Sequence, residues 1–228
     1  MLVLTREDVR ELIEIEGVID AVSAAHAALA AGAASQAIDH ATRLPEGNGV
    51  MLPMAAMISS PAVAGVKLLA DVPENAARGL RTQHSTITLL DPSTGQCLAF
   101  LDGIEITLQR TAAATAVATR HLARKDVHTL GLVGAGAQAR SHLAALTSVR
   151  EFERVTVWSR TRETAERFAT ENAGRGIPIE VLETAEAVVR SADVLCTLTP
   201  SREPLIRGVW FSEGMHVNAV GAPPRPDH

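Results

Sequence analysis

The chain has 228 residues, enough for one large or two modest domains, and its 46% hydrophobic and 21% charged residues are typical of a folded globular protein. The net charge of −5 offers no attraction to a nucleic-acid backbone or an anionic membrane, so neither is expected as a partner. Aromatic residues make up only 3% and tyrosine is missing, so the core must consist chiefly of Ala, Val, Leu and Ile.

Targeting and metal signals are missing from the sequence. Charged residues occur too early for a signal peptide, and no apolar run approaches the roughly 18 residues of a membrane span. Cys97 and Cys196 are isolated in apolar runs, and no His, Asp or Glu cluster has the spacing of metal ligands. We therefore expect a cytoplasmic protein with reduced thiols and no metal.

The N-terminal elements are predicted from capping and periodicity. Residues 1–4 form a short strand, and Thr5 then caps a helix, with Asp8 in the capping-box position. A second helix carries an apolar stripe from Val18 to Leu29 and is ended by Gly32.

A loop-rich stretch is predicted over residues 37–61 and a largely buried strand over residues 62–70. Residues 85–91 and 96–102 have strand character and flank a Pro-Ser-Thr-Gly turn, which predicts a hairpin. A long Ala-rich helix follows over residues 105–124.

Beyond this helix, short apolar runs alternate with helical segments, which predicts a parallel sheet with crossover helices. The expected fold class is α/β, with a Rossmann-type domain at residues 113–228 preceded by an α+β domain at residues 1–112.

A glycine loop follows the first of these runs, in the order Gly134-Ala135-Gly136-Ala137-Gln138-Ala139. It lies between a strand and a helix, as the dinucleotide fingerprint requires. Gly134 permits the tight turn, Gly136 lets the backbone approach a pyrophosphate, and Ala139 allows close helix packing. The helix N-terminus supplies free N–H groups. The loop therefore predicts a bound dinucleotide, the alternative being a purely structural turn.

The next strand ends at Ser159-Arg160, where an NAD-preferring protein usually carries a carboxylate for the ribose hydroxyl. A guanidinium can instead bind a 2′-phosphate through forked, charge-assisted hydrogen bonds. We predict that NADP(H) is preferred over NAD(H) and that Arg160 is the main contact. In the alternative, Arg160 merely lies on a solvated helix start.

Three cations lie in apolar or loop surroundings: Arg43, Lys67 and Arg110. Burying an unpaired cation is costly, so each should have a partner or face a cavity. One interpretation is a cleft that binds an anionic substrate, such as an amino or imino acid carboxylate. The other is three unrelated groups, and spacing alone favours this second interpretation.

The order of several blocks resembles the ornithine cyclodeaminase/mu-crystallin family. These blocks are GVKLL with Pro73-Glu74-Asn75 after it, LLDPSTGQCLAFLDG, QRTAAATAVA, GLVGAGAQA, VWSR and VNAVGAPPRPD. The resemblance covers essentially the whole chain. It implies an N-terminal substrate and dimerisation domain, a Rossmann domain, and a homodimer.

The resemblance also implies roles for individual residues. Arg43, Lys67 and Arg110 would bind the substrate carboxylate. Among the three we predict Lys67 as the catalytic proton donor, because a lysine adds a point charge and can supply a proton. The resemblance also matches Thr82, Ala137, Gln138, Thr199, Asn218, Val220 and Gly221 to cofactor-contacting positions. Together with Arg110 and with Gly134, Gly136, Ser159 and Arg160, these are the residues that we expect at the cofactor.

Two departures from the family pattern bear on activity. Cyclodeaminases carry a catalytic aspartate directly after Asn-Ala-Val-Gly, whereas this chain continues Ala222-Pro223-Pro224-Arg225, with Asp227 displaced. The chain also ends at His228, where family members continue with further helices, so a C-terminally shortened Rossmann domain is expected.

We predict an NADPH-dependent reductase of cyclic imino acids, or a related amino acid dehydrogenase. One alternative is a lyase of the ornithine cyclodeaminase type, which releases ammonia, and the missing aspartate counts against it. The other is a cofactor-binding protein without catalytic activity, or a truncated remnant.

Overall fold

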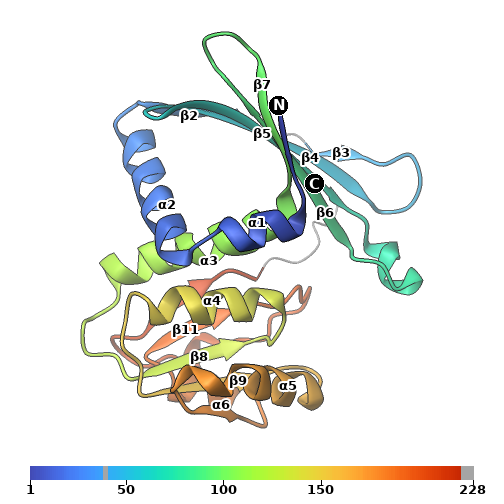
Figure 1. Cartoon of the computed structure of the whole chain (residues 1–228). Helices are drawn as coiled ribbons and strands as arrows, with labels where there is room; N and C mark the ends of the chain where they lie inside the picture. Colours follow the sequence, from blue (N-terminus) through green and yellow to red (C-terminus); the bar gives the residue numbers. More distant parts are fainter. Residues whose placement is uncertain (38–40, 222–228) are drawn as a thin grey trace. The chain divides into compact units, whose positions relative to one another are not determined.

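The computed structural model describes residues 1–37 and 41–221 (Figure 1). They belong to two compact units that divide between Arg110 and Thr111, two residues before the boundary expected from the sequence. No helix in the described ranges is long and apolar enough to cross a bilayer.

The first unit contains a seven-stranded sheet, two helices that connect its first and second strands in chain order, and the start of a third helix. Its elements are β1 (Leu2–Leu4), α1 (Arg6–Leu12), α2 (Ile15–Ala30), β2 (Ala34–Gln36), β3 (Thr42–Arg43), β4 (Val50–Ser59), β5 (Ala62–Asp71), the 3-10 helix η1 (Pro73–Arg78), β6 (Gln83–Leu90), β7 (Cys97–Asp102) and α3 (Gly103–Leu122). The strand order is β1-β7-β6-β5-β4-β2, with β3 also paired to β4.

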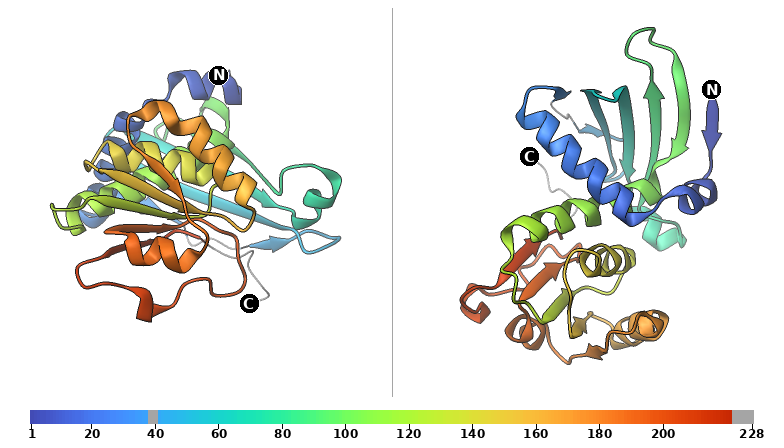
Figure 2. Two further views of the ribbon diagram at one scale, coloured as in Figure 1. Left: turned by 90° about the horizontal axis from the view of Figure 1, so that it is seen from below. Right: turned by 60° about the vertical axis from the view of Figure 1, so that its left-hand side comes forward.

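The two faces of this sheet differ in what covers them. On the inner face, Ala99 and Leu101 of β7 are buried against Val9 of α1 and Ile106 of α3. Alternate residues of β7 point to the outer face, where Phe100 is 41% exposed. Helices α1 and α2 lie along the inner side in the views of Figures 1 and 2.

The prediction of a loop-rich stretch over residues 37–61 is wrong for the ten residues that β4 occupies. Pro53 and the alanines have a low propensity for strands, so the sequence did not indicate a strand here. In the sheet, Pro53 falls between the positions at which β3 and β2 pair with β4 (50–51 and 56–58), so its missing N–H is tolerated there.

The predicted capping box is confirmed, since Thr5 Oγ1 accepts from the Asp8 N–H and Asp8 accepts from the Thr5 N–H. Helix α2 and the glycine that ends it are also confirmed. Its apolar stripe was placed wrongly: Ile19 is fully buried, whereas Leu29 is 48% exposed.

The second unit contains a five-stranded parallel sheet and its crossover helices. Its elements are β8 (Thr129–Val133), α4 (Ala137–Thr147), β9 (Arg154–Trp158), α5 (Arg162–Asn172), the 3-10 helix η2 (Ala173–Arg175), β10 (Ile179–Val181), α6 (Ala185–Ser191), β11 (Val194–Thr197), the 3-10 helix η3 (Gly208–Trp210) and β12 (His216–Ala219).

The strand order β10-β9-β8-β11-β12 is that of a Rossmann-type sheet, so the expected fold class is confirmed. One face of this sheet is covered by α4 and α5, whose Leu143 and Phe168 are fully buried. The other face is covered by α6 through Val188 and Val189. Gly131 allows this close packing, because a Cβ there would lie 2.7 Å from the Cβ of Ala192.

Both tryptophans of the chain belong to this second unit. Trp158 ends β9 and Trp210 ends η3, and each packs, partly buried, against the core cluster around α6. The guanidinium carbon of Arg207 lies 5.9 Å from the centre of the Trp210 ring, within cation–π range.

Candidate functional site

The glycine loop begins directly after β8, at the carboxyl edge of the parallel sheet. Gly134 has a φ of +115°, a conformation that side-chain-bearing residues rarely adopt. A Cβ there would lie 2.9 Å from the Leu198 carbonyl oxygen, in the neighbouring strand-end loop. Both the backbone angle and the space therefore require glycine at this turn.

Helix α4 begins with Gly136 as its N-cap, which provides no side-chain hydrogen bond to the first turn. A Cβ at Gly136 would meet nothing within 4 Å, so the space beside the exposed turn is open. Gln138 Oε1 is buried and has no hydrogen-bond partner within the described residues. The free N–H groups and the open approach fit a dinucleotide pyrophosphate, whereas the orphaned amide oxygen could accept only from a donor such as a ligand hydroxyl.

His142 supports this helix from behind and was not singled out from the sequence. Its ring is fully buried. Nδ1 lies 2.7 Å from the Gln138 carbonyl oxygen, and Nε2 lies 3.1 Å from Thr115 Oγ1 of α3. Burial lowers the pKa of His142, so the ring is neutral, with Nδ1–H donating to Gln138 and Nε2 accepting from Thr115. The signal was a histidine four residues after Gln138 on an otherwise apolar helix face.

The end of β9 places Ser159 and Arg160 at the same carboxyl edge. Arg160 is exposed and forms no interaction with the described residues. Arg162, by contrast, pairs with Glu183 and with Glu166, the latter at 2.7 Å, and these hydrogen bonds raise its pKa. Of the two arginines at this strand end, Arg160 is the one available to a ligand.

The ends of β11 and β12 bring Thr199 and Gly221 together. The Gly221 N–H donates to the Thr197 carbonyl at 2.6 Å, and a Cβ at Gly221 would lie 2.6 Å from the Thr199 carbonyl oxygen. Both residues line a cavity of about 380 Å³ that also contacts Val133, the residue before the glycine loop. The cavity therefore lies along the carboxyl edge, where Rossmann folds bind their ligands.

Asn218, also expected at the cofactor, turns out to lie inside the unit. Its side chain is buried and donates to Thr119 Oγ1 at 3.1 Å and to Cys196 Sγ at 3.6 Å. Its Oδ1 lies 3.2 Å from His216 Nε2. These contacts tie β12 to α3 and β11, so the side chain is committed to the protein. Val220, its second neighbour, is half-buried beside Gly221.

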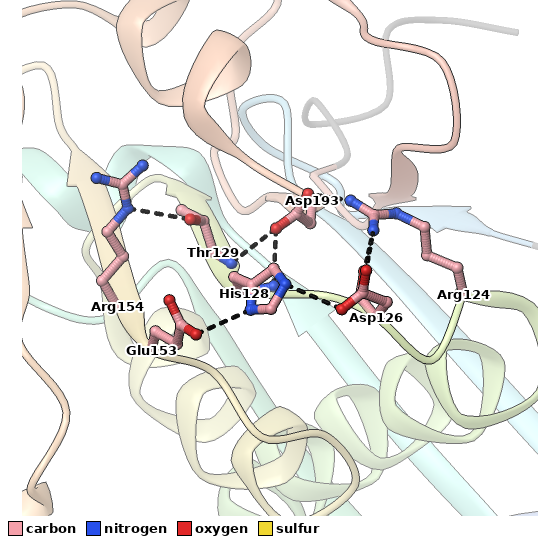
Figure 3. A network of polar contacts seen from close by, with 7 residues as sticks. All are labelled: Arg124, Asp126, His128, Thr129, Glu153, Arg154 and Asp193. Carbon is pink, nitrogen blue, oxygen red and sulfur yellow. Dashed lines mark hydrogen bonds and ion pairs between the residues drawn. The ribbon is translucent and has the colours of Figure 1, made fainter.

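The opposite, amino edge of the sheet carries a closed polar network (Figure 3). Asp193 Oδ2 accepts from the backbone N–H groups of His128 and Thr129 at 2.8 and 2.9 Å, and Arg124 pairs with the same carboxylate. Partial burial alone would raise the pKa of Asp193, but these hydrogen bonds and Arg124 hold it below its ordinary value. Asp126 and Glu153 each lie 3.0 Å from a ring nitrogen of His128.

No group of three or more His, Cys, Asp or Glu side chains in the described part of the chain could hold a metal ion. Burial raises the pKa of the Cys196 thiol to about 12, so this thiol stays protonated and unreactive.

In the first unit, Arg43 and Lys67 project from the inner face of the sheet. Cross-strand partners share a face, and Lys67 lies in one row with Met54, Ile87 and the buried Leu101. Arg43 pairs with Val50, and Val50 pairs with Asp71, so these three side chains share a face. Asp71 follows Lys67 by four residues on β5 and therefore lies on the same face as Lys67.

Arg110 is expected to point to this face as well. It follows Ile106 by one helical turn on α3, and Ile106 packs against the inner-face cluster. Surrounding protein lowers the pKa of Arg110, which nevertheless stays charged. Thr82 also belongs to the first unit, where its carbonyl accepts from the Val72 N–H at 2.7 Å just before β6.

The fold and the glycine loop define a two-unit protein with a Rossmann-type nucleotide-binding architecture. The family model for the ornithine cyclodeaminase/mu-crystallin family matches residues 1–228, and the chain belongs to this family.

Among its relatives, ketimine reductase mu-crystallin of Rattus norvegicus is 42% identical over 146 residues, which is 64% of this chain and 45% of that protein. A Delta(1)-pyrroline-2-carboxylate reductase of Bacillus cereus is 35% identical over 228 residues, 97% of this chain and 68% of that protein. The chain thus spans about half the length of the first relative and two thirds of the second.

Among solved structures, Thermococcus litoralis Delta(1)-pyrroline-2-carboxylate reductase in complex with NADH and L-proline superposes with a TM-score of 0.93 and 38% identity, over 97% of this chain and 69% of that one. An archaeal alanine dehydrogenase dimer with bound NAD gives 0.90 and 34%, over 96% and 67%. A lysine cyclodeaminase gives 0.85 and 33%, over 97% and 67%.

Proposed function

We propose that the protein is an NADPH-dependent reductase of cyclic imino acids, or an amino acid dehydrogenase of the related reaction. The observation that carries this proposal is that Arg43 and Lys67 share one face of the first unit's sheet, while Arg110 follows Ile106, which packs against that face, by one helical turn. The three cations occur in a chain similar to a reductase whose structure contains NADH and L-proline.

In this proposal, the two arginines bind the substrate carboxylate through forked, charge-assisted hydrogen bonds, and Lys67 adds a point charge. The bound cofactor supplies the hydride for the C=N carbon. Lys67 Nζ donates the proton that the ring nitrogen gains, and it is reprotonated from solvent. Fixing the carboxylate orients the C=N bond, which is the protein's main contribution to the rate.

The residues that would hold the cofactor in the second unit follow the carboxyl ends of its strands. Backbone N–H groups at Ala137 and Gln138 would hold the pyrophosphate. Thr199 and Gly221, which line the cavity at the carboxyl edge, and Val220, which directly precedes Gly221, are further proposed contacts. Thr82 and Arg110 are the cofactor contacts proposed for the first unit. A cytoplasmic setting fits this chemistry, because Cys97 and Cys196 are both free.

Turnover is tested by following NADPH oxidation with pyrroline-2-carboxylate and piperideine-2-carboxylate. We expect turnover that Lys67→Met reduces by at least about a hundredfold, as for loss of a general acid. If the wild-type chain fails to oxidise NADPH with every imino acid tested, and also with every keto acid tested in the presence of ammonia, the reductase proposal is wrong.

Preference for NADP(H) over NAD(H) rests on Arg160. Its guanidinium is exposed at the end of β9, whereas that of Arg162 is held by two glutamates. We expect Arg160→Ala to weaken NADPH binding by about ten- to a hundredfold, the worth of a charge-assisted contact, and to leave NADH binding unchanged. Fluorescence titration with both cofactors measures this.

Arg162→Ala is the matched control for Arg160, since it removes an arginine two residues away that is already paired. It should leave the ratio of the two affinities unchanged. If Arg160→Ala weakens NADH and NADPH equally, the proposed contact with the 2′-phosphate is wrong.

We further propose that the first unit binds substrate and forms a homodimer through the outer face of its sheet. Four apolar side chains of this face are partly exposed: Val66 (36%), Leu68 (38%), Phe100 (41%) and Leu98 (45%). An apolar face of this kind usually marks an interface. Analytical ultracentrifugation should show a dimer that Phe100→Glu dissociates. A wild-type monomer at micromolar concentration would rule this assembly out.

A lyase that cyclises a diamino acid is the second candidate, because a lysine cyclodeaminase is 33% identical over most of the chain. The position at which such enzymes would carry the aspartate, after Gly221, lies outside the described residues. Ammonia release from ornithine or lysine without net change in nicotinamide absorbance would favour this candidate over the reductase.

A further inference from the structure

The Pro73-Glu74-Asn75 motif lies in the segment from Val72 to Thr82 that connects β5 to β6, and neither the substrate nor the cofactor contacts account for it. The segment is closed on itself: the Val72 N–H donates to the Thr82 carbonyl at 2.7 Å, and Asn75 Nδ2 donates to the Arg81 carbonyl at 2.9 Å. The Asn75 side chain therefore stabilises its own loop, whereas the Glu74 carboxylate contacts a different turn.

Glu74 reaches outside this segment, to the turn between β3 and β4. Its Oε1 accepts from the Asn48 N–H at 2.8 Å. The carboxylate lies against Gly47, where a Cβ would be 3.0 Å from Oε1, and Gly47 has a φ of +76°. The Asn48 N–H lowers the pKa of Glu74, so the carboxylate is charged. The contact joins residues 26 positions apart in the sequence.

The turn held by Glu74 is the continuation of the strand that carries Arg43. Strand β3 pairs with β4 at only two positions, and the Leu44 N–H closes the turn on the Gly49 carbonyl at 2.8 Å. Two ladder pairs are a weak anchor for a hairpin. The contact to Glu74 is a further attachment, and it links the turn to a loop that is closed by its own hydrogen bonds.

We propose that Glu74 is a positioning residue for the substrate carboxylate: by holding the β3–β4 turn at Asn48, it fixes the backbone from which Arg43 extends. The inference rests on the proposed function, in which Arg43 binds that carboxylate. The carboxylate keeps its charge while the neighbouring C=N bond is reduced, so Arg43 binds it alike in the ground state and the transition state, and Arg110 still orients it when Arg43 is displaced. Loss of its positioning therefore raises KM and leaves kcat nearly unchanged.

The test is a double-mutant cycle on the full chain, with KM and kcat for pyrroline-2-carboxylate and the Kd of L-proline measured for each variant. We expect Glu74→Ala to raise KM and Kd about tenfold, because the turn next to Arg43 loses its attachment at Asn48, and to change kcat less than about twofold. Arg43→Ala should have a larger effect. The double variant should match Arg43→Ala alone, because Glu74 acts through Arg43.

Two conservative variants separate reach from charge. Glu74→Gln keeps an oxygen that can accept from the Asn48 N–H, so KM should return to near the wild-type value. Glu74→Asp keeps the charge but is one methylene too short, so it should behave like Glu74→Ala. If Glu74 were merely structural, Glu74→Ala would lower the melting temperature without raising KM more than it changes kcat. Its effect on KM would then add to that of Arg43→Ala in the double variant.

The outcomes separate this inference from the function on which it rests. If Arg43→Ala leaves KM and Kd unchanged, or if the wild-type chain neither turns over nor binds these ligands, the proposed function fails and this inference fails with it. If Arg43→Ala raises KM while folded Glu74→Ala and Glu74→Asp do not, the function stands and the role of Glu74 is wrong.

Discussion

The two edges of the parallel sheet in the second unit are built in opposite ways. At the amino edge, Asp193 satisfies two backbone N–H groups and an arginine at once, and His128 lies between two carboxylates. At the carboxyl edge, α4 starts without a side-chain cap and Gln138 Oε1 has no partner within the described residues. The satisfied polar groups at the amino edge stabilise the fold, whereas the unsatisfied polar groups at the carboxyl edge are left for a ligand.

The contrast between the two edges is tested most severely at Gly134. Gly134→Ala forces a side chain into a φ of +115° and against the Leu198 carbonyl, which costs about 1–3 kcal/mol of backbone strain. We expect cofactor binding to weaken by at least tenfold and the melting temperature to fall, as measured by fluorescence titration and thermal unfolding. Gly136→Ala is the matched control: its Cβ meets no protein atom, so only binding should suffer. Equal losses of stability in both variants would contradict this explanation.

The amino edge should fail in stability alone. Asp193→Ala leaves the N–H groups of His128 and Thr129 without their acceptor, at a cost of about 1.5–3 kcal/mol. The melting temperature should fall by roughly 3–12 °C with cofactor affinity unchanged. Because the folded pKa of Asp193 lies below its unfolded value, the stability it gives is present above the unfolded pKa and is lost as the pH falls through the folded one. The wild-type protein and the variant should therefore converge in acid, and a constant gap would argue against the ion pair.

The smallest effect is expected at His142, whose ring bridges α4 and α3 through Gln138 and Thr115. Burial lowers its pKa in the folded state, so the unfolded chain takes up a proton first as the pH falls below about 6.5. Stability should thus decline from roughly pH 7 to pH 5, and less so in His142→Gln. His216, whose pKa is also lowered by burial, accounts for part of the slope that remains. An unchanged slope in the variant would assign it to other groups.

The sequence was most informative where local chemistry decides the structure. The capping box at Thr5, the hairpin around Gly95, the long helix and the alternation of the second unit all follow from nearest neighbours in the chain. Strand β4 was missed because its proline is tolerated only through the arrangement of two short partner strands.

For the site, the glycine loop could be located because its geometry is encoded within six residues. The commitment of Asn218 to Thr119 and the contact of Glu74 with Asn48 could not, since each joins residues far apart in the chain. That Arg160 is available and Arg162 is not depends on Glu183, which comes from beyond α5. Site roles for Arg43, Lys67 and Arg110 remain predictions until the variants are measured.

The placement of both tryptophans in the second unit has a practical consequence for spectroscopy. With no tyrosine anywhere and Phe100 as the sole aromatic residue before Thr111, the first unit is nearly silent in ultraviolet emission. Indole fluorescence therefore reports the unfolding of the second unit alone, whereas far-ultraviolet circular dichroism reports both. The difference between the two signals isolates the first unit without any label, and Trp158, directly before Ser159-Arg160, is a built-in probe beside the proposed cofactor contact.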